Sequence, residues 1–79
     1  MAEPLRVAAG ERSAEELLDA LEDGRRVVVE TEMFGGSHEV TLRHDGDVYY
    51  CDTPTTLHRH ESSDGMRRCI VKNGYGEAA

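Results

Sequence analysis

The chain has 79 residues, of which 32% are charged, and its 16 acidic and nine basic side chains give a formal net charge of −7. A chain of this length forms one small domain with a marginal core, since it buries only a little over ~60% of the surface that it exposes when unfolded. The opening residues lack the apolar run of a secretory signal, and no segment approaches the ~18 apolar residues of a membrane span. We therefore expect a cytoplasmic protein without a membrane partner.

The basic residues are almost all arginine, because Lys72 is the one lysine. In this composition the chain resembles the small acidic proteins of salt-loving archaea. The resemblance extends diffusely over the whole chain and matches no named family. It implies a halophilic protein whose carboxylates keep the surface hydrated in concentrated salt. At ~1 M salt the Debye length is about 3 Å, which screens most of the repulsion between those carboxylates.

The strongest local signal predicts a helix from about Ala14 to Asp23. Ser13 and Glu16 have the spacing of a capping box, and Gly24 suits the left-handed position that ends a helix. Apolar residues at the helical spacing i, i+3, i+4 and i+7 form one stripe that packs inward: Ala14, Leu17, Leu18 and Leu21. The acidic opposite face indicates solvated surface. A short strand at Leu5–Ala8 is a further candidate before this helix.

After the helix the apolar period changes to two, which is typical of half-buried strands. We predict strands from about Arg25 to Phe34, from His38 to His44 and from Asp47 to Asp52, with Asp45-Gly46 as the hairpin turn.

The hairpin register decides which side chains of the third strand enter the core. If Asp45-Gly46 is a two-residue turn, Leu42 faces Tyr49, Val40 faces Cys51, and Cys51 points to the core. A three-residue loop with a bulge would reverse this parity and send Val48 and Tyr50 inward, so both registers remain open.

The C-terminal part is predicted to be a long polar connection over residues 53–65, a last strand from Met66 to Lys72, and a mobile tail from about Asn73. The whole chain, residues 1–79, then forms a single small α+β domain. We expect a mostly antiparallel sheet of three to five strands with one short helix packed on one face.

Four candidate metal ligands fall within nineteen residues, in the order Cys51, His58, His60 and Cys69. Thiolate and imidazole are the ligands that structural zinc selects, and an extended segment places both histidines on one side of the chain. The spacing matches no common zinc finger, so two alternatives stay open. In the first alternative the cysteines are ordinary buried residues and the histidines are solvated loop residues. In the second, Cys51 and Cys69 form a disulfide.

The sequence favours a small binding or accessory protein over an enzyme, because neither cysteine has the activating and orienting groups that nucleophilic catalysis requires. A sheet edge or face could bind a protein partner or a second copy, which would make a homodimer. A further alternative is single-stranded nucleic acid, bound through Arg59, Arg67 or Arg68 with nearby tyrosines. The acidic net charge opposes this last function, so a nucleic-acid partner is not expected.

Overall fold

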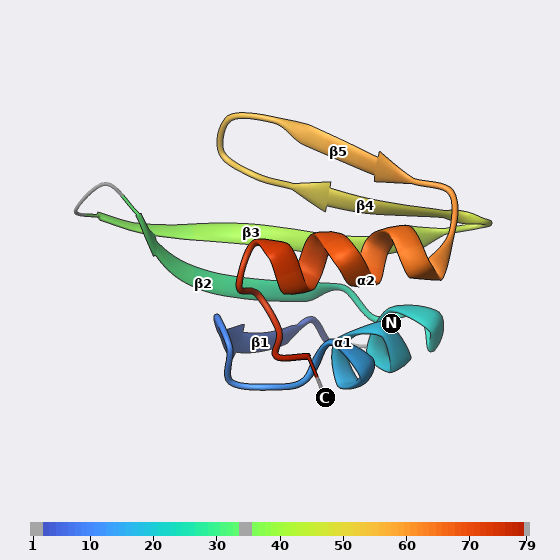
Figure 1. The fold of residues 1–79 in the computed structure, drawn as a ribbon, viewed down its shortest axis with the longest axis horizontal. Helices are drawn as coiled ribbons and strands as arrows, with labels where there is room; N and C mark the ends of the chain where they lie inside the picture. The colour runs from blue at the N-terminus through green and yellow to red at the C-terminus, as the bar shows by residue number, and fades with distance from the viewer. Residues whose placement is uncertain (1–2, 34–35, 79) are drawn as a thin grey trace.

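A computed structural model of the chain describes residues 3–33 and 36–78. In this part of the chain the elements are, in order, β1 (Leu5–Ala8), α1 (Ala14–Glu22), β2 (Val27–Met33), β3 (Gly36–Asp45), β4 (Val48–Asp52), β5 (Leu57–His60) and α2 (Ser63–Lys72). The strands form one sheet in the order β1-β2-β3-β4-β5, in which β1 is parallel to β2 and the other neighbours are antiparallel (Figure 1). The expected α+β fold with a mostly antiparallel sheet is confirmed. The expectation of a single helix is wrong, since two helices occur in the described chain.

Helix α1 forms where its sequence signals predict it. The Ser13 side chain accepts a hydrogen bond from the Glu16 amide at 3.2 Å, and the Glu16 side chain reaches back to the Ser13 amide, which completes the capping box. Gly24 follows the helix with φ 89°, a conformation that glycine adopts without strain. The helix carries the chain from β1 to β2, because two parallel strands require a crossover connection.

The β3–β4 hairpin turns one residue later than the sequence suggests. Asp45 pairs with Val48, so the turn consists of Gly46 and Asp47, and Gly46 supplies the positive φ of 62°. Leu42 consequently lies opposite Cys51 and not opposite Tyr49. A shift of two residues preserves the parity of a strand, and Cys51 and Tyr49 still point into the core. Phe34, at the end of the preceding predicted strand, lies outside the described residues.

The predicted long connection contains a strand. Thr53 and Thr56 close a tight turn, in which the Thr53 amide donates to the Thr56 carbonyl at 2.9 Å and the Thr53 hydroxyl donates to the same carbonyl at 2.7 Å. The chain reverses there, and β5 pairs with β4 in antiparallel orientation. The polar composition of β5 concealed it, because an edge strand with little burial lacks the apolar alternation by which strands are recognised.

The predicted last strand is the helix α2. Ser62 caps it by accepting a hydrogen bond from the Gly65 amide at 3.0 Å. Met66, Cys69 and Ile70, which are buried, have the i, i+3, i+4 spacing of a helix face. Ile70 and Val71, the adjacent apolar residues of the predicted strand, both pack on the core, as neighbours on a helix can and neighbours in a strand of period two do not.

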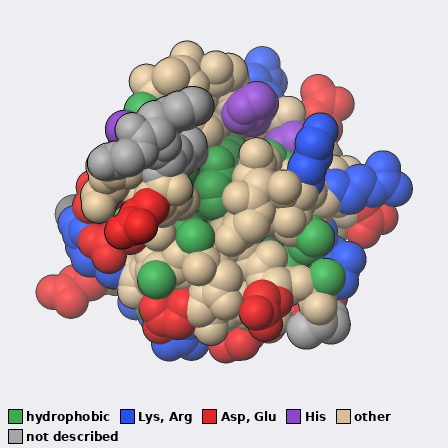
Figure 2. Space-filling model, turned by 60° about the vertical axis from the view of Figure 1, so that its left-hand side comes forward, with side chains coloured by type: hydrophobic (Ala, Val, Ile, Leu, Met, Phe, Trp, Pro, Cys, Tyr) green, Lys and Arg blue, Asp and Glu red, His purple; other side chains and the backbone are tan. Residues whose placement is uncertain are grey.

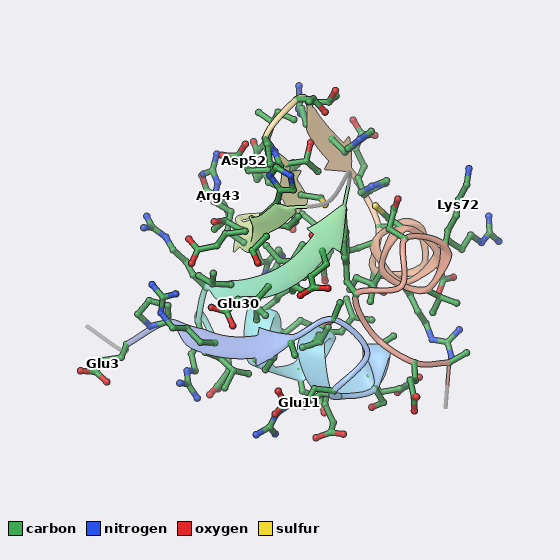
Figure 3. The ribbon with its side chains drawn as sticks, turned by 90° about the vertical axis from the view of Figure 1, so that its left-hand side faces the viewer. Glu3, Glu11, Glu30, Arg43, Asp52 and Lys72 are labelled. Atoms are coloured by element: carbon green, nitrogen blue, oxygen red, sulfur yellow. The ribbon has the colours of Figure 1, made fainter. Side chains whose placement is uncertain are left out.

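Both helices cover the same face of the sheet. Helix α1 lies against β2 and β3, α2 lies against β4 and β5, and the two helices contact each other. The buried apolar residues of both helices meet those of the strands in one core between these layers. In Figure 3, Arg43 and Asp52 extend from the sheet on the side away from α2, whereas Lys72 extends from α2 itself. No described helix is long and apolar enough to cross a membrane.

The segment after Asn73, which the sequence predicts to be a mobile tail, packs against the start of α1. Tyr75 is 3% exposed and Gly76 is buried. The Ala14 amide donates to the Glu77 carbonyl at 2.8 Å, and the Glu77 amide donates to the Arg12 carbonyl at 3.1 Å. These contacts make residues 75–77 part of the packed domain.

Candidate thiol and histidine site

The two cysteines meet between the sheet and α2. Cys51 lies in β4 on the face that the helices cover, and Cys69 belongs to the buried stripe of α2. Both are free and buried, and they lie beside each other. They converge because strand parity turns Cys51 toward the helix layer while helix periodicity turns Cys69 toward the sheet.

The two histidines come from β5 at different distances from the sulfurs. His58 lies directly opposite Cys51 in the β4–β5 ladder, and its side chain is exposed. His60 is half-buried and lies next to Cys69. The Nε2 atom of His60 is buried and has no hydrogen-bond partner. The sequence therefore identified four residues that lie close together, with His60 at the thiol pair and His58 at its edge.

The two neighbouring thiols shift each other's pKa in opposite directions. The pKa of Cys69 falls to about 5, chiefly because the Cys51 thiol donates a hydrogen bond to its sulfur and also because His60 lies beside it. The pKa of Cys51 is raised, because this thiol keeps the proton that bonds the pair and because it is buried. Burial, together with the neighbouring thiols, raises the pKa of Tyr75 to about 12.

Two residues that the sequence did not indicate complete the surroundings. Asn73, which ends α2, donates from Nδ2 to the Cys69 carbonyl at 2.8 Å and to the Cys69 sulfur at 3.4 Å. The buried Tyr75 lies beside Cys51. Asn73 contacts Cys69 from four residues along the chain, so this contact follows once residues 63–72 form a helix and not the predicted strand. Tyr75 reaches Cys51 of β4 from a distant part of the sequence, which no local pattern indicates.

A small pocket of about 210 Å³ opens beside the pair. Its walls come from β3, the β4–β5 turn, β5 and the end of α2, and consist of His38, Thr53, Pro54, Thr55, His58, Asn73 and Tyr75. Figure 2 shows histidine side chains gathered on this side of the molecule next to an apolar hollow. Neither cysteine lines the pocket, but His58, Asn73 and Tyr75 do.

The four predicted ligands are neighbours, but they are not already disposed as a finished metal centre. Within residues 3–33 and 36–78, no group of three or more His, Cys, Asp or Glu side chains is arranged to hold a metal ion. The geometry is therefore that of a buried thiol pair with the half-buried His60 beside it and the exposed His58 on the same strand as His60.

The arginines named for nucleic-acid binding do not form one patch. Arg59 lies on β5, opposite Tyr50 of β4, on the face of the sheet without helices. Arg67 and Arg68 lie on α2, on the other side, where Arg67 bonds to Glu15 at 3.3 Å. The guanidinium above Tyr50 belongs instead to Arg43, at 4.3 Å from the ring centre.

The fold and this site define a small α+β domain with a buried cysteine pair beside two histidines. Residues 1–78 match a family of unknown function, DUF8001, and the chain belongs to that family. No curated protein and no solved structure matches the chain.

Proposed function

We propose that this domain is a small binding protein that holds a zinc ion with Cys51, Cys69, His58 and His60. The observation that carries the proposal is their convergence: residues from β4, β5 and α2 meet at one place, although eighteen positions separate the first from the last. Two thiolates and two neutral imidazoles are a common ligand set of structural zinc, and their two negative charges balance the charge of the ion.

The arrangement around the sulfurs supports this ligand set. The buried Nε2 of His60 is a polar atom without a partner, and such atoms normally find one. A metal bound there would accept its lone pair. The exposed His58 ring can turn toward Cys51, which lies directly across the ladder. Binding would displace the thiol protons, since zinc binds the thiolate form.

A zinc ion at this place would have a structural role. With four protein ligands it has no open position for a substrate, which is the arrangement of structural sites. It would join two strands to the helix above them. A chain of this size has a marginal core, and metal binding to the folded state alone adds its binding free energy to the stability.

Native mass spectrometry tests the proposal. We expect one zinc ion per chain after purification in the presence of zinc and a reductant. Cys69→Ser and His60→Gln should lose the ion, and His44→Gln should keep it, because His44 stacks on Tyr49 at 4.2 Å and lies outside the four candidates. A wild-type protein that stays free of zinc, or variants that bind it as well as the wild type does, would refute the proposal.

A second candidate function is reversible disulfide formation between Cys51 and Cys69, which their adjacent free sulfurs favour. In this reaction the thiols lose two protons and two electrons, and a small-molecule disulfide is reduced to two thiols. Treatment of the metal-free protein with such a disulfide should lower the intact mass by about 2 Da if the bond forms. An unchanged mass under oxidising conditions would exclude it, and Cys51→Ser provides the control.

A further inference from the structure

The face of the sheet that lacks helices in the described chain carries an ordered pattern of charge. We call it the outer face and define it by the strand residues that alternate with the core residues. Its middle is the pair Val28 and Thr41, which lie opposite each other on β2 and β3. Glu30 and Glu39 form the next outer-face pair on one side. On the other side Arg43 follows on β3, and Arg26, directly before β2, lines the same hollow as Arg43.

The sign of the charge therefore reverses across the middle of the outer face. Along β2 the basic Arg26, directly before the strand, and the acidic Glu30 lie on opposite sides of Val28. Along β3 the basic Arg43 and the acidic Glu39 lie on opposite sides of Thr41. Because β2 and β3 are antiparallel, the two bases share one end of the face and the two acids share the other. When a second copy is rotated by 180° about an axis across the strands and placed on this face, its acids lie opposite the bases of the first copy.

We propose that the outer face binds the outer face of a second copy of this chain. The two copies are related by a two-fold axis that lies between the two faces, perpendicular to the strands, and passes over Val28 and Thr41. This axis sets Arg43 against Glu39 of the second copy and Arg26 against Glu30 of the second copy. Each contact occurs twice, as a two-fold interface requires. Leu57 lies in the same row across the strands as Thr41, through Asp52, and is 50% exposed. The same rotation therefore brings Leu57 opposite Leu57 of the second copy.

The side chains concerned are available for these contacts. Glu39 forms an ion pair with Arg6 at 3.0 Å, but both side chains are more than half exposed, at 57% and 60%, so this pair contributes little and can be exchanged. Arg43 is held in position by its stacking on Tyr50. Asp52 lies opposite Thr41, on the proposed axis, so it faces Asp52 of the second copy. Arg43 and Arg59 are its diagonal neighbours on the same face and offset its negative charge.

The size of the face suits such an interface. A specific contact buries roughly 800 Å² on each partner. The molecule measures 35 × 26 × 25 Å, so one broad side can supply that area. A nucleic acid fits this face less well, because the row of acids would lie against its phosphates. The inference is independent of the zinc site, which lies on the helix side of the sheet.

Charge reversal followed by mixing tests the axis. We expect wild-type protein to be a dimer in concentration-dependent sedimentation at ~0.15 M salt. Arg43→Glu and Glu39→Arg should each weaken the dimer at least about tenfold, because each places like charges opposite one another twice. An equimolar mixture of the two variants should recover a heterodimer at wild-type affinity, because both contacts then regain opposite charges.

Arg68→Glu is the matched control, since it makes the same change of charge at an exposed position of α2 and should leave the dimer unchanged. Circular dichroism checks that each variant is folded. A monomeric wild type, a dimer insensitive to both reversals, or a mixture that fails to recover would each overturn the proposal. Binding of a single-stranded oligonucleotide by a monomeric wild type, lost in Arg43→Glu, would assign the face to nucleic acid instead.

Discussion

Replacing Gly76 by alanine is expected to destabilise the domain. A methyl group at this position would lie 2.9 Å from Cγ2 of Ile70 and 3.0 Å from both the Ala14 nitrogen and Cδ1 of Leu17. The Ala14 nitrogen cannot retreat freely, because it donates a hydrogen bond to the Glu77 carbonyl at 2.8 Å. The added methyl must therefore displace side chains of the core.

Two opposing effects determine the size of the change. Inserting one methyl into a well-packed site costs about 1–3 kcal/mol. Alanine also restricts the unfolded chain, which favours folding by about 0.4–1 kcal/mol where the native conformation accepts it. We expect overpacking to dominate and the free energy of unfolding to fall by about 1–2 kcal/mol. In a domain of this size that corresponds to a decrease of about 5–15 °C in Tm.

Urea denaturation and thermal melts of the purified variant measure this change. Ala78→Gly serves as the control, because Ala78 is exposed and its replacement should change stability by no more than about 0.5 kcal/mol. An unchanged or increased stability of Gly76→Ala would refute the reasoning. It would mean that residues 75–77 do not pack against α1 and that the tail is mobile, as the sequence alone suggests.

Three further perturbations probe the core, the second helix and the charge. Leu21→Ala should lower the free energy of unfolding by about 2–5 kcal/mol, because Leu21 is fully buried; chemical denaturation showing a loss below about 1 kcal/mol would contradict its place in the core. Ser62→Ala should cost about 1 kcal/mol through loss of the cap of α2, and Ser63→Ala should cost less; equal losses in the same assay would contradict the cap. Thermal melts should show Tm rising from dilute buffer to ~1 M salt, and a flat or falling curve would show that repulsion between carboxylates does not limit stability.

Helix α1 and helix α2 differ in how far the sequence determines them. The start of α1 is set by a capping box and its end by Gly24, so its bounds could be predicted to within one residue. In α2 the cap is Ser62, one of two adjacent serines in a polar run, and no capping box marks it. Its apolar residues end in Ile70 and Val71, which also fit a strand. Contact with β4 and β5 decides for the helix, and that contact is not local in the sequence.

The place of Cys51 in the core could be predicted for a two-residue turn, which is one of the two registers that the sequence leaves open. A shift of two residues in the hairpin changed its partner from Val40 to Leu42 and left it in the core. The parity of His58 and His60 follows from their spacing in the same way. Their position could not be predicted, because it depends on a strand that lies within an apparently irregular segment.

Cys69 reaches the other three residues for a reason different from the expected one. The sequence predicts Cys69 in a strand beside that of Cys51, in which case a metal would fasten the long connection with the two histidines to the sheet. In the structure Cys69 approaches from α2, so the candidate ligands belong to two layers. Under the zinc proposal the ion would therefore fasten the helix to the sheet, at the side of the domain where α2 packs against β4 and β5. This is where a small core gains most from a cross-link, because β5 itself buries few side chains.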